Sequence, residues 1–176
     1  MTKWMTEPVE IVPYDDRWPG RAQELISDLT ELLAPRLTGG IHHVGSTAVP
    51  GLPAKPIIDL LAGVDGLDLA EDIYETLKAD GWHYVPPDLD DRAWRRLFVK
   101  VKAEKRSAHL HLIQPSNERW AKELEFRDRL RADPGVAMAY AQLKRKLAAE
   151  HHDDREAYTL GKTDFIRSAL AKTMGA

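Results

Sequence analysis

Three side chains with metal-binding chemistry lie on two short apolar segments of this chain. Asp59 stands inside the apolar run 56–64, while His109 and His111 alternate with apolar residues in 108–113. Alternate residues of an extended strand share a face, so the two imidazoles project to the same side. One carboxylate and two imidazoles can bind a divalent ion such as Mg²⁺, Mn²⁺ or Zn²⁺. The sequence therefore predicts Asp59, His109 and His111 as metal ligands and catalytic residues.

The same three side chains also have a structural explanation, and the sequence leaves both open. A carboxylate inside an apolar strand is costly unless a cation or hydrogen-bond donors compensate it. Two half-buried histidines can equally be hydrogen-bonded to their neighbours. His42 and His43 are adjacent on another predicted strand, so they point to opposite faces and at most one can join the cluster.

A candidate phosphate-binding turn precedes the acidic strand. Gly45 and Ser46 follow the apolar strand 41–44, and free backbone N–H groups at such a turn can bind an anion. The spacing excludes a P-loop, because Lys55 comes too late after Gly45. Lys55 can either contact the same phosphate or be solvated, and Gly45-Ser46 can simply be a tight turn.

Three further cations lie beside apolar positions and complete the predicted phosphate-binding set. Lys162 follows Tyr158 by four residues, and Arg127 follows Leu124 by three, so both lie near apolar helix faces. Arg96 lies on a predicted strand. These cations either balance Asp59 or bind an anionic ligand such as a nucleotide.

The composition restricts the class of protein. The chain has 176 residues, a net charge of −3 from 25 basic and 28 acidic residues, and no cysteine. It therefore lacks thiolate chemistry, and an acidic protein is not expected to bind nucleic acid in general. The first residues lack the apolar run of a signal peptide, and no run is long enough to span a membrane. A cytoplasmic location is expected.

The elements that must position these residues form an α+β domain. Residues 1–8 are expected to be a flexible N-terminal arm, and 9–172 a single domain. A helix over 22–33 precedes the central strands, a second helix over 68–80 interrupts them, and three helices follow residue 116. The polar stretch 102–107 is short enough for a hairpin. Strands are expected at 9–12, 41–44, 56–64, 82–85, 95–101 and 108–113.

A set of short motifs extends over residues 9–166, nearly the whole chain. The motifs are 12–15 (VPYD), 18–19 (WP), 43–52 (HVGSTAVPGL), 55–60 (KPIIDL), 109–111 (HLH), 126–128 (FRD) and 154–155 (DR), with Tyr158, Lys162 and Phe165. On these residues the chain resembles the GrpB family, whose domain is also found fused behind dephospho-CoA kinase. The resemblance implies a nucleotidyltransferase-like mixed sheet with flanking helices and a helical C-terminal half.

That superfamily also implies a site. A Gly-Ser turn binds the triphosphate, which matches Gly45-Ser46, and paired acids on the next strand bind two magnesium ions. Asp59 matches the first acid, but Leu61 stands at the second position and cannot bind metal. A third acid on a later strand is replaced by His109 or His111, and imidazoles favour zinc, nickel or manganese over magnesium.

Three hypotheses follow from this partial match. The first is a nucleotidyltransferase that uses a nucleoside triphosphate, a divalent metal and a small acceptor. The second is a catalytically inactive member that serves as a binding or accessory module, which the loss of an acid at Leu61 favours. The third is a metal-dependent hydrolase built on Asp59, His109 and His111. The expected partner is a small molecule or nucleotide, and the oligomeric state stays open.

Overall fold

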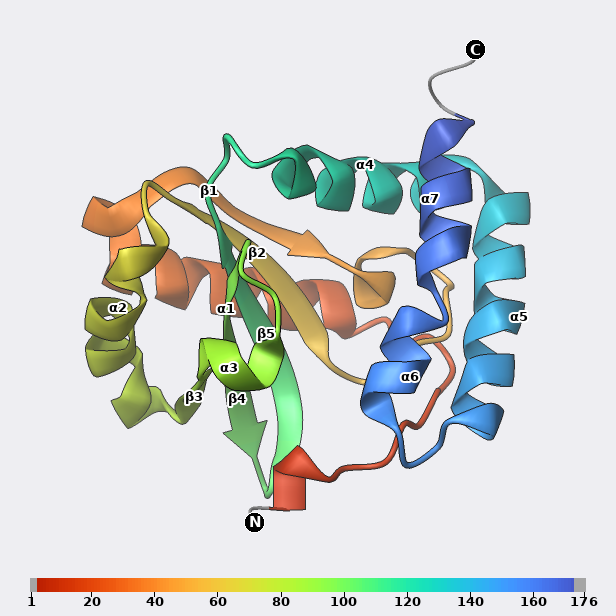
Figure 1. Cartoon of the computed structure of the whole chain (residues 1–176), viewed down its shortest axis with the longest axis horizontal. Helices are drawn as coiled ribbons and strands as arrows, with labels where there is room; N and C mark the ends of the chain where they lie inside the picture. Colours follow the sequence, from red (N-terminus) through yellow and green to blue (C-terminus); the bar gives the residue numbers. More distant parts are fainter. Residues whose placement is uncertain (1–2, 173–176) are drawn as a thin grey trace.

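The computed structural model describes residues 3–172, which fold around a five-stranded mixed sheet (Figure 1). The strands lie in the order β1-β2-β5-β4-β3, with β2 and β5 parallel and the other neighbouring pairs antiparallel. Their bounds are β1 Leu37–Val44, β2 Ile58–Val64, β3 Trp82–Val85, β4 Arg96–Lys102 and β5 Lys105–Ile113. This arrangement confirms the predicted α+β class.

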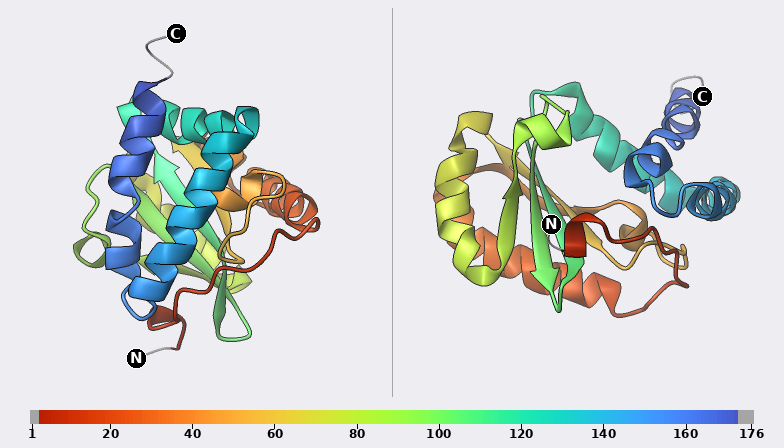
Figure 2. Two further views of the ribbon diagram at one scale, coloured as in Figure 1. Left: turned by 90° about the vertical axis from the view of Figure 1, so that its right-hand side faces the viewer. Right: turned by 60° about the horizontal axis from the view of Figure 1, so that its bottom comes forward.

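The helices divide between the two sides of the sheet. α1 (Trp18–Leu33) and α2 (Ala70–Leu77) cover one face, and the C-terminal helices gather on the other side (Figure 2). Within residues 3–172, no helix is long and apolar enough to cross a membrane. The remaining helices are α3 Pro87–Asp90, α4 Glu118–Ala132, α5 Pro134–Glu150, α6 Arg155–Leu160 and α7 Thr163–Ala171.

The face toward α1 and α2 forms the main apolar core. Leu60, Phe98 and Leu110 come from three neighbouring strands, and each is 0% exposed. Phe98 also stacks on Tyr84, with 5.0 Å between the ring centroids. Because alternate residues of a strand point to opposite faces, the residues between these positions project toward the C-terminal helices.

The parallel pairing of β2 and β5 determines which side chains meet on this second face. Asp59 pairs with His109, and Leu61 pairs with His111, so all four project to the same side. The pairing confirms the common face predicted for the two histidines and adds Asp59 to it. Leu61 is 0% exposed and belongs to a small apolar cluster beneath α4.

The chain before α1 crosses the molecule without forming a strand. Val12 makes an isolated antiparallel bridge to Ala54, so the strand predicted over 9–12 is wrong. Glu7 contacts two distant segments: its carboxylate accepts a hydrogen bond from the Arg106 backbone N–H, and its carbonyl accepts one from Arg155. Residues 1–2 of the expected arm lie outside the described residues, and the flexibility of 1–8 stays a prediction.

Two connections differ in detail from the sequence expectation. The hairpin between β4 and β5 is confirmed, but it turns on Ala103 and Glu104, whose φ angles are 50° and 63°. Two successive left-handed residues match the twist of antiparallel strands and permit a shorter turn than 102–107. The last predicted helix is divided into α6 and α7 at Gly161 and Lys162. Glycine is a weak helix former, and this one packs closely against Leu147 of α5.

The two glycines Gly63 and Gly20 should respond in opposite ways to alanine. A Cβ on Gly63 would lie 1.8 Å from the carbonyl oxygen of Thr38, whereas one on Gly20 in α1 would meet nothing within 4 Å. We expect Gly63→Ala to lower the free energy of unfolding by about 1–3 kcal/mol. Gly20→Ala should raise it by about 0.5–1 kcal/mol. Urea unfolding measures both, and equal effects would contradict the close approach of β1 and β2.

Candidate functional site

The centre of the site is a carboxylate held by two imidazoles. Asp59 Oδ1 lies 3.0 Å from His109 Nδ1 and 3.3 Å from His111 Nε2. Burial raises the pKa of Asp59, but hydrogen bonds from the two histidines outweigh it and hold the pKa well below its usual value. Burial lowers the pKa of His109 to about 4, despite the attraction of Asp59. The cluster therefore contains an ionised carboxylate beside a neutral His109.

Two arginines determine where the imidazole protons lie. Arg95 Nη1 is 2.9 Å from His111 Nδ1, and Arg106 Nη1 is 3.4 Å from His109 Nε2. A guanidinium can only donate, so each of these outer nitrogens accepts a hydrogen bond. The inner nitrogen of each imidazole then carries a proton and donates it to Asp59. The Asp59 carboxylate also explains the two histidines structurally, as the sequence allowed.

These hydrogen bonds set a condition on metal binding. By ligand type and spacing, Asp59, His109 and His111 form a possible metal site, because their donor atoms lie within 4.8 Å of one another. A metal-bound imidazole, however, normally donates its outer N–H to a carboxylate or carbonyl. Here both outer nitrogens face guanidinium donors. An ion held by all three side chains therefore does not fit the hydrogen-bonded form of the cluster.

The Gly45–Ser46 turn lies directly against the carboxylate. Gly45 has φ 72° and ψ −172°, a conformation nearly restricted to glycine, and a Cβ there would approach Asp59 Oδ2 to 2.8 Å. The turn continues into a 3₁₀ helix, Ser46–Ala48, and the Ser46 side chain lies near the hydroxyl of Tyr140 in α5. Since both imidazoles bind Oδ1, the other carboxylate oxygen faces the turn.

Three lysines from separate segments lie near the turn and Asp59. Lys55 and Lys162 contact the ring of Tyr158, with their Nζ atoms 5.1 and 4.6 Å from its centroid. Lys144 of α5 lies 5.0 Å from the Tyr140 ring and donates to the carbonyl of Pro53. Aromatic faces stabilise the ammonium groups there without neutralising them.

The charges in this region are strongly unbalanced. Burial lowers the pKa of Lys162 to about 8 and that of Lys144 to about 7, although Asp59 opposes both shifts. Burial and the charges of Lys162 and Arg155 also lower the pKa of Lys55 well below its usual value. Asp59 thus attracts Lys55, Lys144, Lys162 and Arg155, and these positive charges also repel one another. Such a site favours an added anion.

The structure brings most of the predicted residues together but separates Arg96 from them. Arg96 pairs with Leu112 and projects to the α1–α2 face, where it donates to the carbonyls of Ala93 and Arg95. The period of a strand explains this correction, because Arg96 is one residue from Leu97, which faces His111. The predicted set that meets on one side is Gly45, Ser46, Lys55, Asp59, His109, His111 and Lys162.

Arg127 and the His42–His43 pair lie near the cluster but have other partners. Arg127 donates to the carbonyl of His43 and forms an ion pair with Asp128. The His43 ring lies on the opposite face and hydrogen-bonds with Thr47, and burial lowers its pKa to about 4. His42 shares the Asp59 face but packs on Trp120 of α4. Arg127 and His43 thus contact residues on either side of Gly45 in the chain, at His43 and Thr47.

Three residues of the site were not identified from the sequence. Lys144 had a detectable signal, since it follows Tyr140 by four residues as Lys162 follows Tyr158, and both pairs stack. Arg95 and Arg106 had no such signal. Arg95 reaches the site from the α3–β4 connection, where it also pairs with Asp90 at 2.6 Å, and that placement depends on the tertiary fold.

Comparison with solved structures identifies the fold. A crystal structure of the Cid1 poly(U) polymerase superimposes with a TM-score of 0.52 at 18% identity, over 86% of this chain and 49% of that one. The fold is thus that of nucleotidyltransferase-type polymerases. A structure described as conserved protein GrpB from Enterococcus faecalis matches more fully, with a TM-score of 0.81 at 28% identity over 94% of this chain and 99% of that one.

Sequence comparison then gives the family. The family described as GrpB protein matches residues 8–172, so the chain belongs to the GrpB family. It is 38% identical to the UPF0157 protein YqkA of Bacillus subtilis over 92% of this chain, and spans 46% of that relative's length. It is 30% identical to the glutamate-rich protein GrpB of Alkalihalophilus pseudofirmus, over 92% of this chain and 94% of that one. A dephospho-CoA kinase of Mycolicibacterium paratuberculosis contains a similar region at 28% identity.

Leu61 cannot be exchanged for the acid expected at its position without loss of stability. Its side chain is fully buried in an apolar cluster, so a carboxylate there would lose its hydration. We expect Leu61→Asp to lower the free energy of unfolding by about 3–5 kcal/mol, by analogy with other uncompensated buried charges. Leu61→Met should cost less than about 1.5 kcal/mol. Urea unfolding tests this, and a stable Leu61→Asp variant that gains magnesium affinity would contradict it.

Removing Arg95 should improve metal binding rather than weaken it. Without its guanidinium, His111 can carry its proton on Nδ1 and offer Nε2 as a ligand. We expect Arg95→Ala to raise the Zn²⁺ affinity by about tenfold or more in the absence of nucleotide, the size of effect seen for outer partners of metal ligands. Isothermal titration calorimetry measures the affinity.

The exposed Arg167 of α7 provides the matched control. Arg167→Ala should leave Zn²⁺ affinity unchanged, and the gain in Arg95→Ala should vanish when His111 is also replaced by alanine. Tight Zn²⁺ binding by the wild-type protein that Arg95→Ala weakens would show that the arginine supports the metal site instead.

Proposed function

We propose that this chain binds a nucleoside triphosphate beside the Gly45–Ser46 turn and transfers its nucleotidyl group to a small acceptor. The observation that carries the proposal is the convergence of this turn, Asp59 and three lysines on one side of the sheet. The lysines come from the β1–β2 connection, from α5 and from the α6–α7 junction. Groups contributed by separate elements surround a ligand better than groups along one helix.

In this proposal the phosphate chain lies between Ser46 and the lysines. The Ser46 hydroxyl can donate to a phosphate oxygen, and the ammonium groups of Lys144 and Lys162 can neutralise its charge. Binding of an anion would raise the pKa values of these two lysines, which burial lowers to about 7 and 8. The ligand therefore supplies the negative charge that the free site lacks.

Asp59 has a separate role in this proposal. Its Oδ2 faces the turn, while the two imidazoles hold Oδ1 and keep the carboxylate ionised. Magnesium is commonly bound by one or two carboxylates together with substrate phosphates. Oδ2 is thus suited to a divalent cation that enters with the triphosphate, and such a cation would polarise the α-phosphate.

The proposed reaction is a displacement at the α-phosphorus. An acceptor oxygen forms a bond to this phosphorus while the bond to the bridging oxygen breaks. Pyrophosphate leaves with the electron pair, and the acceptor proton passes to solvent. Lys144 and Lys162 stabilise the negative charge that develops on pyrophosphate. The residues of the chain thereby bind, orient and neutralise the phosphates.

The comparison with Cid1 supports the proposal at the level of fold. That polymerase has been solved with magnesium and 3′-dATP bound, and its fold resembles this chain. Because one fold can host many functions, the argument depends on the side chains described above. A cytoplasmic protein that uses a small-molecule acceptor, as expected from the sequence, remains part of the proposal.

Leu61 favours a second candidate function. With an apolar side chain in place of a second acid, the chain would bind a nucleotide without turning it over and act as a binding or accessory module. Nucleotide binding without pyrophosphate release identifies this case. The metal-dependent hydrolase is less consistent with the site, because Arg95 and Arg106 compete for the histidines it needs.

Lys144→Met should weaken nucleotide binding while Lys146→Met should not. Lys144 is 1% exposed beside the site, whereas Lys146 lies two residues along α5 with a 70% exposed side chain. We expect the dissociation constant for Mg-ATP, or for whichever of GTP, CTP and UTP binds, to rise about tenfold or more in Lys144→Met, since a hydrogen bond to a charged group contributes about 1.5–3 kcal/mol. Calorimetry gives these constants.

Pyrophosphate release, measured with the same nucleotides and a panel of small hydroxyl-bearing acceptors, separates the two candidates. Lys162→Met should behave like Lys144→Met. Failure of all four nucleotides to bind, with magnesium or manganese present, would contradict both functions. Equal weakening by Lys144→Met and Lys146→Met would place the nucleotide elsewhere.

A further inference from the structure

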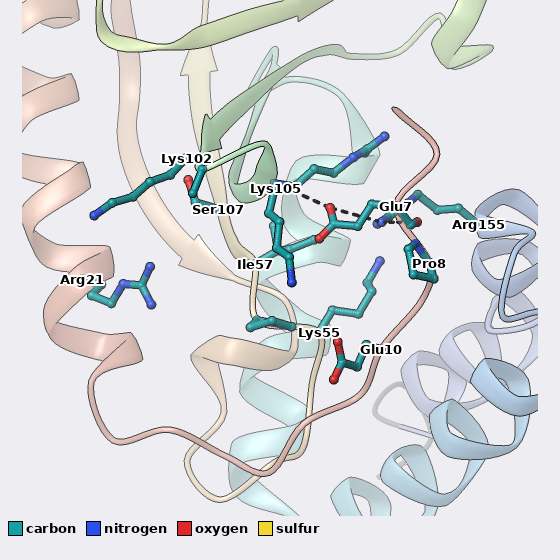
Figure 3. Close-up of a pocket in the computed structure, with 13 residues that line it drawn as sticks. Glu7, Pro8, Glu10, Arg21, Lys55, Ile57, Lys102, Lys105, Ser107 and Arg155 are labelled. Atoms are coloured by element: carbon teal, nitrogen blue, oxygen red, sulfur yellow. Dashed lines mark hydrogen bonds and ion pairs between the residues drawn. The ribbon is translucent and has the colours of Figure 1, made fainter. Parts of the chain in front are cut away.

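A second basic region adjoins the site at one end of the sheet. It is a cleft of about 350 Å³ between the N-terminal segment, the start of α1, the β1–β2 connection and the β4–β5 hairpin (Figure 3). Its lining contains the acidic residues Glu7 and Glu10. The cations that line it are Arg21, Lys55, Lys102, Lys105, Arg106 and Arg155.

The cations of the cleft exceed its acidic groups by four formal charges, six against two. Burial and the neighbouring Arg155 lower the pKa of Arg106 to about 10. Burial likewise lowers the pKa of Lys55, and Lys162 and Arg155 lower it further. Like charges held together in a partly buried space destabilise the free protein, and an anion relieves that repulsion.

Arg155 and Glu7 indicate where an anion would lie. The Nε and Nη1 atoms of Arg155 are buried and have no hydrogen-bond partner among residues 3–172. Its Nη2 lies 3.9 Å from the carboxylate of Glu7, which also accepts from the Arg106 N–H at 3.1 Å. Figure 3 shows Arg155 beside this carboxylate, with Lys55 and Lys105 in the same cleft. The Glu7 carboxylate thus lies where an external anion would bind.

The cleft is joined to Asp59 through side chains. Arg106 contacts His109, which donates to Asp59, and Lys55 lies between the cleft and Lys162. A ligand in the cleft would therefore lie on the far side of His109 from the Asp59 carboxylate. The nucleotide position proposed above lies on the Ser46 side of the same carboxylate.

We propose that this cleft binds a phosphate group of the second substrate, the acceptor, and that Glu7 competes with it for the same cations. The assignment to the acceptor rests on the proposed nucleotidyl transfer, but anion binding by the cleft does not. Guanidinium and ammonium groups together suit a phosphate, which carries up to two charges, better than a single carboxylate. The volume of the cleft suits a small molecule rather than a polymer.

Inorganic phosphate is the probe for this cleft, with binding followed by amide chemical shifts of the full ¹⁵N-labelled chain. We expect the amides of Glu7, Arg106 and Ser107 to shift with phosphate concentration. Lys105→Glu should weaken this binding about threefold or more, because a charge reversal replaces attraction by repulsion. Glu7→Gln should strengthen it about threefold, since a competing charge is removed.

Lys146→Glu is the matched control, because it reverses a lysine charge on the outer side of α5. It should leave the phosphate dissociation constant unchanged. The proposal that the cleft binds phosphate is overturned if Glu7→Gln binds phosphate no more tightly than the wild-type protein. It is also overturned if Lys105→Glu binds phosphate as well as the wild-type protein does. A phosphate titration that shifts only the Gly45 and Ser46 amides would likewise contradict phosphate binding in the cleft.

The same spectra distinguish failure of this inference from failure of the proposed function. Mg-ATP should shift the Gly45 and Ser46 amides in both wild-type and Lys105→Glu proteins. If it does not, while phosphate still shifts the Arg106 and Ser107 amides, nucleotide binding and the acceptor assignment are wrong and the anion-binding cleft stands. Saturating phosphate should not displace ATP. Displacement would show that phosphate and ATP bind at one site rather than two.

Discussion

The parallel pairing of β2 with β5 is the constraint on which the site depends. It is the parallel contact in an otherwise antiparallel sheet, and it places Asp59 opposite His109 and two residues along the register from His111. A carboxylate in a central strand is tolerated because two imidazoles donate to it, and the imidazoles are oriented by Arg95 and Arg106. A shift of one residue in this register would bury the carboxylate against the α1–α2 core and leave it without donors.

Around that carboxylate the protein accumulates positive charge without matching it. The cations come from loops, α5, the α6–α7 junction and the hairpin, so each is held by a different part of the fold. Tyr140 and Tyr158 support the lysines through their ring faces and add no negative charge. A protein that is acidic overall, with a net charge of −3, thus contains a locally basic centre. The net charge of the chain therefore does not indicate the local charge around Asp59.

The sequence predicts those parts of the fold and site that depend on local pattern. Strand period places His109 and His111 together on one face. The same period already separates Arg96 from Leu97, but the sequence does not say which face carries the site. The division of the last helix at Gly161, and the approach of Arg95 and Arg106 to the histidines, result from packing between distant segments.

Arg95 joins two otherwise separate regions, because one guanidinium serves both Asp90 and His111. Asp90 is 7% exposed and has Arg92 as its other ionic partner. A ligand that requires His111 to release Arg95 must also change the balance of charge around Asp90, in the segment between β3 and β4. Occupancy of the site and local order of this segment are then thermodynamically linked, and the link is reciprocal. The local order of this segment would then change when a ligand binds near Asp59, although the segment does not contact the ligand.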